Sequence, residues 1–230
     1  MTEPEHPPAG LDRSHRLPDP PVHRPLRTAL AGAALALLAI VGVTAAFLGA
    51  GPAQADGAVL GETLQARSAE LTGLATAITT IGNTASMGLL ATLVGLWLIR
   101  RRRGVDALFV VGTMAGASAL FTGIKRLLDR PRPPLADRLV VASNESLPSG
   151  HATMAVAVLG SLVVLAWHRR GALTRVAMVA AVAGWAGAVG LTRVYLGVHW
   201  FSDVLAGWLV GGAWLALCAA LWSWHRTRSP

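Results

Sequence analysis

The feature that most constrains this chain is a series of apolar segments, each long enough to cross a lipid bilayer. Residues 28–50 and 176–192, for example, carry no charged side chain. A helix needs roughly 20 apolar residues to span the hydrocarbon core of a membrane. Only 14% of the 230 residues are charged, against about 25% in soluble domains, and the mean hydropathy is +0.51. We therefore expect one membrane domain and no second, soluble domain.

Spanning helices satisfy their own backbone hydrogen bonds inside lipid, so the expected fold is an all-α, six-helix transmembrane bundle over residues 26–225. Residues 1–25 are rich in Pro, His, Asp and Arg, and are expected to form a disordered cytoplasmic tail rather than a cleaved signal peptide. The predicted spans are Leu26–Ala50, Ile78–Ile99, Val105–Leu128, Ser149–Trp167, Leu173–Thr192 and Phe201–Trp224.

The connection between the first two spans is more polar than the spans themselves. Its leucines recur at helical spacing, which predicts an amphipathic helix on the membrane surface within residues 51–77. The leucines that set this pattern are Leu60, Leu64, Leu71 and Leu74.

The distribution of charge predicts how the bundle is oriented. With a cytoplasmic N-terminus, the inner side carries 13 basic and 5 acidic residues, and the outer side carries 7 of each. The positive-inside rule therefore places both termini in the cytoplasm and the protein in the cell membrane. Because the basic residues lie in short runs beside apolar segments, the net charge of +8 indicates topology and not nucleic-acid binding.

Three polar segments are left without an explanation from topology, and the six-span order brings all three to the outer face. The first contains Lys125, the only lysine of the chain, near the end of a span. An ionisable group at such a depth usually has a specific partner, but a lysine at a helix end also snorkels towards water. Both interpretations of Lys125 stay open at this point.

The proline-rich sequence that follows Lys125 contains two arginines. Prolines stiffen the backbone around Arg132, and a rigidly held guanidinium suits two phosphate oxygens at once. The alternative is a stiff surface turn with solvated arginines, which is the interpretation that we favour for Arg130.

The second polar segment, Pro148–His151, opens the fourth predicted span. Ser149 is expected to cap this helix, and Gly150 lets a ligand approach the backbone closely. The free amides of a helix start favour an anion, beside which His151 is suited to donate a proton to a leaving oxygen. The alternative is a simple helix cap followed by an interfacial histidine.

The third polar segment contains Arg193, His199 and Asp203. His199 and Asp203 are four residues apart and share a helix face if the sixth helix starts by His199. A carboxylate bound to one imidazole nitrogen leaves the other as a lone-pair nucleophile. Arg193 precedes the turn and is placed to grip a phosphate. The alternative, a His–Asp pair that only caps the helix, is disfavoured by the position of Asp203 in an apolar segment.

Together these segments resemble the signature of the type 2 phosphatidic acid phosphatase family, a membrane branch of a superfamily shared with vanadium-dependent haloperoxidases. The family pattern is Lys-x6-Arg-Pro, then Pro-Ser-Gly-His, then Ser-Arg-x5-His-x3-Asp. The chain departs from it only at Thr192, which replaces Ser and keeps the hydroxyl. The matching residues are Lys125 with Arg132-Pro133, then Pro148 to His151, then Thr192-Arg193, His199 and Asp203.

The resemblance implies a lipid phosphate phosphatase that works through a phosphohistidine and needs no metal or other cofactor. By this likeness His199 is the nucleophile, Asp203 orients it, and His151 protonates the leaving alkoxide. The substrate is expected to be a lipid phosphate or diphosphate in the outer leaflet, and vanadate is expected to inhibit as a mimic of the transition state. The residues expected to hold the phosphoryl oxygens are Lys125, Arg132, Ser149, Gly150 and Arg193.

Two alternatives use the same residues. An enzyme of this fold can pass the phosphate to another lipid or to a sugar instead of water, and a transporter or scaffold can use the cations only to bind an anion. An anion-binding site has no need of an oriented His–Asp pair with a second histidine, which argues against the transporter. Phosphatidic acid, phosphatidylglycerophosphate and an isoprenoid diphosphate all fit the expected site.

Overall fold

The computed structural model describes residues 25–228, and every regular element within them is helical. The prediction of an all-α bundle is therefore confirmed, while the predicted tail lies outside the described residues except for Pro25. The helices are α1 (Pro25–Phe47), α2 (Asp56–Gln65), α3 (Ala69–Ile81), α4 (Thr84–Arg100), α5 (Gly104–Leu128), α6 (Gly150–Ala166), α7 (Ala172–Tyr195) and α8 (Phe201–Arg228), with short 3-10 turns η2 (Gly51–Ala55), η3 (Leu135–Asp137) and η4 (Trp167–Arg169).

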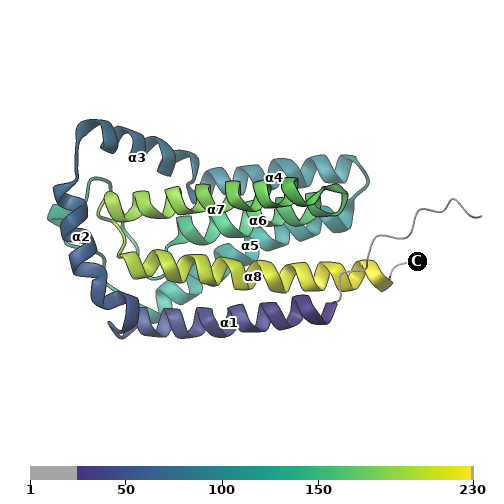
Figure 1. Cartoon of the computed structure of the whole chain (residues 1–230), viewed down its shortest axis with the longest axis horizontal. Coiled ribbons are helices and arrows are strands. Elements are labelled where there is room, and N and C mark those ends of the chain that lie inside the picture. The colour runs from purple at the N-terminus through teal and green to yellow at the C-terminus, as the bar shows by residue number, and fades with distance from the viewer. Residues whose placement is uncertain (1–24, 229–230) are drawn as a thin grey trace, which may run out of the picture.

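Six of these helices lie side by side along the long axis of the molecule, namely α1, α4, α5, α6, α7 and α8 (Figure 1). Within residues 25–228, five helical stretches are long and apolar enough to cross a membrane, and α6, with 17 residues, is a shorter apolar helix. α2 and α3 lie at one end of the bundle, which we call the loop end. α1 begins and α8 finishes at the opposite end, which we call the terminal end.

The connection after α1 differs from the single amphipathic helix that was predicted over residues 51–77. It contains η2, α2 and most of α3. The helix is interrupted between α2 and α3, where the Ser68 hydroxyl accepts a hydrogen bond from Leu71 N and caps the start of α3. The second span also begins later than the predicted Ile78. The Asn83 side chain accepts from Ser86 N at 2.7 Å and so starts α4 as a new helix. Both differences arise because a polar side chain caps a new helix start.

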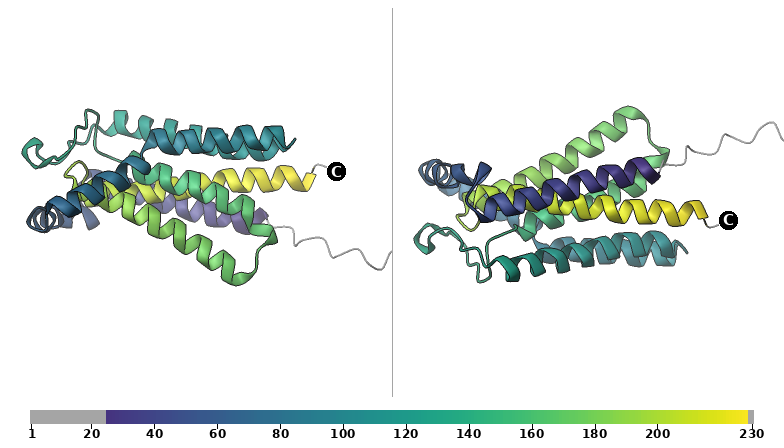
Figure 2. Two further views of the ribbon diagram at one scale, coloured as in Figure 1. Left: turned by 90° about the horizontal axis from the view of Figure 1, so that it is seen from above. Right: turned by 90° about the horizontal axis from the view of Figure 1, so that it is seen from below.

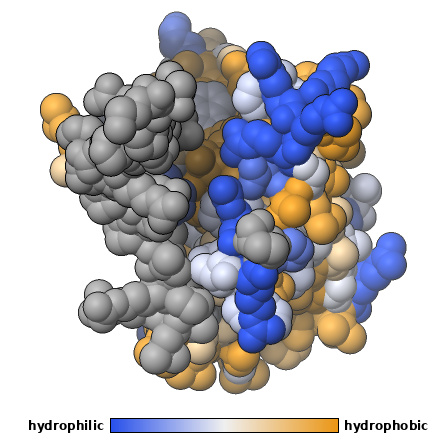
Figure 3. All heavy atoms as spheres, turned by 90° about the vertical axis from the view of Figure 1, so that its right-hand side faces the viewer, coloured by the Kyte–Doolittle hydropathy of each residue, from blue (hydrophilic) through white to orange (hydrophobic). Residues whose placement is uncertain are grey.

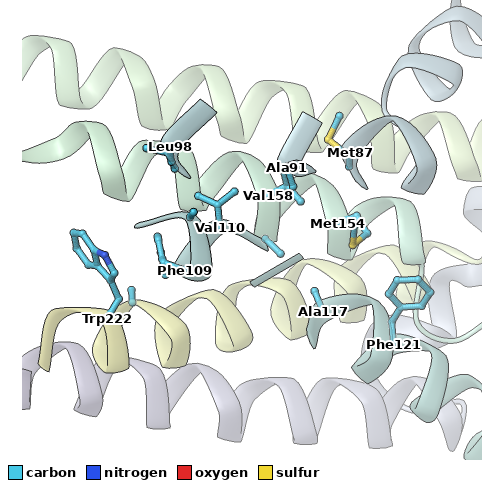
Figure 4. Close-up of a cluster of buried hydrophobic side chains, with 13 residues drawn as sticks. Met87, Ala91, Leu98, Phe109, Val110, Ala117, Phe121, Met154, Val158 and Trp222 are labelled. Carbon is cyan, nitrogen blue, oxygen red and sulfur yellow. The ribbon is translucent and has the colours of Figure 1, made fainter. Parts of the chain in front are cut away.

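The main hydrophobic core joins α4, α5, α6 and α8 (Figure 4). Val110 and Val158 are fully buried within it, and Phe109 stacks on Trp222 with ring centroids 5.2 Å apart. Phe121 and Met154 continue the cluster towards the loop end. This packing fixes the end of α5 relative to the start of α6.

Two glycines allow α8 to lie directly against the backbone of α6. A Cβ at Gly207 would lie 2.7 Å from the carbonyl oxygen of Ser149, and one at Gly211 would lie 2.6 Å from that of Thr153. Small residues four apart are a usual device for close helix contact in membranes. The contact sets the distance between the starts of α6 and α8.

A buried carboxylate ties the helices together at the terminal end. Asp106, 6% exposed, accepts hydrogen bonds from Arg103 at 2.6 Å and from the Trp222 indole at 2.8 Å. Arg226 lies 3.4 Å from the same carboxylate. The start of α5 is thus held to the last turns of α8, far from the loop end.

Candidate active site

The three polar segments that were singled out in the sequence meet at the loop end of the bundle. α5 and α7 finish there, and α6 and α8 begin there, so the ends of four helices surround one volume. Lys125, Arg193, His199 and Asp203 are all buried in this region. Their convergence follows from the alternating directions of the helices.

Asp203 is the most connected carboxylate of the site and is fully buried. Its Oδ2 atom accepts hydrogen bonds from the Ser146 hydroxyl and from Trp200 N, and it lies 3.4 Å from His199 Nδ1. Its Oδ1 atom accepts from Arg130. A carboxylate with donors on both oxygens is held in one orientation and stays ionised.

His199 lies in the turn between α7 and α8, and not on α8 as the shared helix face required, because α8 begins at Phe201. The pair still meets, since Asp203 folds back over the first turn of α8 and accepts from Trp200 N. The turn depends on Gly197, whose φ is +70° and where a Cβ would lie 2.2 Å from the Asp137 carbonyl oxygen.

The hydrogen bonds of His199 define its tautomer. Nε2 lies 3.2 Å from an Arg132 guanidinium nitrogen. Because a guanidinium only donates, Nε2 must present its lone pair, and the ring proton then resides on Nδ1, which faces Asp203. Burial lowers the pKa of His199 to about 3 against the opposing effect of Asp203, so the imidazole is neutral at neutral pH.

Arg132 is held from several sides by oxygens of neighbouring loops. It donates to the backbone and side-chain oxygens of Asn144, each at 2.6 Å, and to the carbonyl oxygens of Glu145 and Val198. Burial lowers the pKa of Arg132 to about 10, and the guanidinium therefore remains charged at neutral pH. One edge of this cation faces His199.

Lys125 is 3% exposed and does not snorkel towards the surface. Its ammonium donates to the carbonyl oxygens of Glu145 and Ser146, the latter at 3.1 Å. The same loop therefore binds both Lys125 and Arg132, and it holds two cations beside one histidine.

Two buried polar atoms of the site have no hydrogen-bond partner among the described residues. They are Ser149 Oγ and Arg193 Nε. Another nitrogen of Arg193 donates to Thr79 Oγ1 at 2.7 Å, which fixes the guanidinium. Buried polar groups are nearly always paired, so two unpaired donors in one site suggest a polar ligand.

The start of α6 differs from the prediction at Ser149. This residue occupies the N-cap position, but its side chain makes no capping bond, while its backbone NH donates to the Asp203 carbonyl oxygen at 2.9 Å. The first amides of α6 therefore keep their capacity to donate to an anion. Gly150 packs closely here, because a Cβ would lie 3.0 Å from the Phe121 ring. His151 follows it in the first turn of α6.

The interpretation of Arg130 as a solvated arginine is wrong. Its side chain is only 12% exposed and forms ion pairs with Asp203 and, at 2.8 Å, with Asp56. Asp56 also accepts from the backbone NH and the hydroxyl of Ser202, at 2.9 and 2.6 Å. Asp56, Arg130, Ser146 and Ser202 thus support the site although no motif marks them. A lone acid beside the first span was the one sequence signal for Asp56.

Within residues 25–228, no group of three or more His, Cys, Asp or Glu side chains is arranged to hold a metal ion. The positive charge of the site comes from side chains. They are Lys125, Arg132 and Arg193, with Arg130 behind Asp203.

The chain is similar to known proteins both in sequence and in structure. The sequence pattern of the PAP2 superfamily matches residues 106–228. Phosphatidylglycerophosphatase B of Bacillus subtilis (strain 168) is 32% identical over 165 residues, which cover 68% of this chain and 78% of that protein. Lipid A 1-phosphatase of Rhizobium etli is 31% identical over 139 residues, which cover 52% of this chain and 54% of that protein.

A solved structure has the same fold over most of the chain. The transmembrane PAP2 type phosphatidylglycerolphosphate phosphatase from Bacillus subtilis superposes with a TM-score of 0.74 and 25% sequence identity. The match covers 86% of this chain and 97% of the other.

Proposed function

Since the chain belongs to the PAP2 superfamily, we propose that it is a membrane phosphatase that hydrolyses a lipid phosphate or diphosphate through a phosphohistidine. The observation that carries this proposal is the state of His199. Its Nδ1 faces Asp203, while Nε2 presents a lone pair towards a group of cations. The relatives named above, both lipid phosphatases, support the class of substrate.

In the first step His199 Nε2 attacks phosphorus, and the bond between phosphorus and the lipid oxygen breaks. His151 donates its proton to that oxygen, and the lipid leaves as an alcohol. With a diphosphate substrate the terminal phosphorus is attacked, its bond to the bridging oxygen breaks, and the lipid leaves as its monophosphate. Asp203 accepts from Nδ1 and stabilises the positive charge that develops on the imidazole. The tautomer that the geometry defines is the one that this step requires.

In the second step water attacks the phosphohistidine, and the bond between Nε2 and phosphorus breaks. The proton of water passes to His151, which is now neutral and acts as a base. Phosphate leaves and both histidines return to their first state. The step needs no group beyond water and the residues of the site.

The phosphoryl oxygens are proposed to lie among Lys125, Arg132 and Arg193. Ser149 Oγ and Arg193 Nε, the two unpaired buried atoms, are available to donate to them. The amide of Gly150 completes the set at the start of α6. Fixed cations that are already in place stabilise the charge that spreads over the phosphoryl oxygens in the transition state. For this reason we propose that catalysis is independent of metal ions.

The site is proposed to open on the extracytoplasmic side and to act on lipids of the outer leaflet. Support comes from the basic side chains of the terminal end, which follow the positive-inside rule for a cytoplasmic face. They come from four separate stretches of the chain: Arg100 to Arg103, Arg170, Arg175 and Arg226 with Arg228. The loop end, which holds the site, then faces outward.

The experiment is a phosphate-release assay on the purified protein in detergent. Phosphatidic acid, phosphatidylglycerophosphate and an isoprenoid diphosphate are supplied in turn, with EDTA present and His199→Ala as control. We expect release that persists in EDTA, stops with vanadate and is absent in the folded variant. Retained activity in His199→Ala would contradict the proposal that His199 is the nucleophile. If no lipid releases phosphate, a labelled donor mixed with candidate acceptors tests phosphate transfer. If neither hydrolysis nor transfer is detected, the remaining function is anion binding.

A further inference from the structure

An apolar groove lies between α6, α7 and α8 and widens towards the terminal end. α7 diverges from its neighbours in that direction (Figure 2). The space that it leaves has a volume of about 680 Å³ and is lined almost entirely by apolar side chains. Val156, Val179, Ala183 and Leu215 represent the three helices in its wall.

The groove is separate from the candidate active site. On α8 its wall begins at Leu215, 12 residues after Asp203, or roughly 18 Å along a helix. Nearer the site α7 and α8 are in close contact, since a Cβ at Gly190 would lie 2.6 Å from Val204 and 2.7 Å from Trp208. This contact closes the groove before it reaches the catalytic residues.

Two arginines lie over tryptophans that line the groove at its terminal end. Arg175 lies over the ring of Trp167 at 5.2 Å and donates to its carbonyl oxygen at 3.2 Å. Arg226 lies over the ring of Trp222 at 5.0 Å. Both tryptophans belong to the wall of the groove. The terminal end of the groove is therefore flanked by two positively charged side chains, Arg175 and Arg226.

The charge of Arg175 is not neutralised by an acidic side chain of the described part of the chain. Arg226 shares Asp106 with Arg103, and its own side chain is 54% exposed. Figure 3 shows hydrophilic side chains gathered at this end of the molecule beside apolar ones. An apolar slot beside the unpaired guanidinium of Arg175 and the exposed one of Arg226 fits an apolar chain with an anionic head.

We propose that this groove binds one anionic phospholipid of the leaflet opposite to the candidate active site. An acyl chain lies between α6, α7 and α8, and the headgroup phosphate accepts hydrogen bonds from Arg175 and Arg226. Basic pockets between membrane helices bind anionic headgroups in this way. The lipid is a fixed constituent of the fold and not the substrate.

Native mass spectrometry of the full chain tests this, with phosphatidylglycerol or phosphatidylcholine added. Phosphatidylglycerol is a phosphodiester without a terminal phosphate, so hydrolysis does not enter the measurement. We expect one retained phosphatidylglycerol and no retained phosphatidylcholine. Arg175→Gln is expected to weaken retention about 10-fold or more, because a charge-assisted hydrogen bond is lost.

Arg101→Gln is the matched control. Arg101 also lies over a tryptophan of the terminal end, Trp97, at 5.7 Å, but Trp97 is 50% exposed and is not part of the groove. This variant is expected to retain the lipid as the wild type does. Equal loss in Arg101→Gln and Arg175→Gln would mean diffuse attraction and would overturn the proposal.

Ala183→Trp tests the apolar part without a change of charge. Ala183 is exposed in the groove, so a larger side chain fills the space without disturbing the core. We expect loss of the retained lipid with phosphate release from a lipid substrate unchanged. If the wild type is a dimer that this variant dissociates, the occupant of the groove is a second copy of the chain. If the variant retains phosphatidylglycerol as the wild type does, the groove is not the lipid-binding site. Either result overturns the proposal.

Discussion

Arg130 donates a hydrogen bond to Asp203 across 73 residues of the chain, on the carboxylate oxygen that does not face His199. The carboxylate is thus held from both sides, with a cation on one oxygen and the imidazole on the other. A second nitrogen of Arg130 binds Asp56, which also caps the start of α8 through Ser202 N. The orientation of the proposed nucleophile therefore depends on a residue of the first extramembrane connection.

Arg130→Gln is expected to lower both stability and turnover. The variant leaves the buried Asp56 and Asp203 without their shared cation, which costs about 3 kcal/mol or more in unfolding free energy. Thermal unfolding in detergent and phosphate release measure the two effects. Arg126→Gln, an exposed arginine at the same end of α5, is the control and is expected to behave as wild type. Equal behaviour of the two variants would exclude a positioning role for Arg130.

Asp203→Asn is expected to reduce kcat by about 10²–10⁴-fold. An asparagine amide can donate to Nδ1, which favours the tautomer with the proton on Nε2 and removes the attacking lone pair. Acid-stable and acid-labile phosphate on the protein, measured after mixing with labelled substrate, reports the phosphohistidine. Normal formation of acid-labile phosphate in this variant would show that Asp203 does not orient His199.

His151→Ala is expected to affect substrates according to their leaving group. An alkyl phosphate needs a proton on the departing oxygen, whereas p-nitrophenolate leaves without one. The variant should therefore lose most of its activity on a lipid phosphate and keep much of it on p-nitrophenyl phosphate. The ratio of the two rates is the measurement. A uniform loss on both substrates would point to a binding role for His151 instead.

Gly211→Ala and Gly212→Ala form a matched pair on neighbouring positions of α8. A Cβ at Gly211 would lie 2.6 Å from the Thr153 carbonyl oxygen, whereas one at Gly212 meets nothing within 4 Å. We expect Gly211→Ala to lose about 1–3 kcal/mol of stability and to lower turnover by moving α6 away from α8. Gly212→Ala should unfold at the wild-type temperature or slightly above it. The unfolding temperatures in detergent decide between these expectations.

The pKa of His199, lowered by burial from 6.5 to about 3, predicts how stability changes with pH. Between these values the unfolded chain binds a proton at this residue and the folded chain does not, so stability is lost as the pH falls from 6.5 towards 3. The wild type should lose unfolding temperature over this window more steeply than His199→Gln. Parallel curves for the two proteins would contradict the depressed pKa.

Sequence reasoning predicted the bundle and the meeting of the motif residues because both depend on local regularities. Apolar length marks each span, and the number of spans decides which segments share an end of the bundle. Lys125 and Arg193, 68 residues apart, are brought to one end by this count alone. The helix starts at Ser68 and Asn83 also carry ordinary capping residues, which are local signals in the sequence.

The support of the site was not predictable in the same way. Arg130 and Arg132 share the same proline-rich surroundings, and only the path of the loop turns one towards Asp203 and the other towards His199. Asp56 lies in no motif, and its partners are distant in the chain. Ser149 was expected to cap α6 by its position, but its hydroxyl is unpaired beside the proposed phosphate. Tertiary contacts override local preference at each of these positions.

The length of α6 has a consequence for how the protein meets its substrate. Its 17 residues extend about 25 Å, less than the roughly 30 Å of a bilayer's hydrocarbon core. We therefore expect the start of α6, with the cations around it, to lie below the level of the surrounding headgroups. A lipid phosphate reaches them by lateral diffusion while its chains stay in the membrane. Turnover should then follow the mole fraction of substrate in the bilayer, so that dilution with inert lipid slows the enzyme at constant bulk concentration.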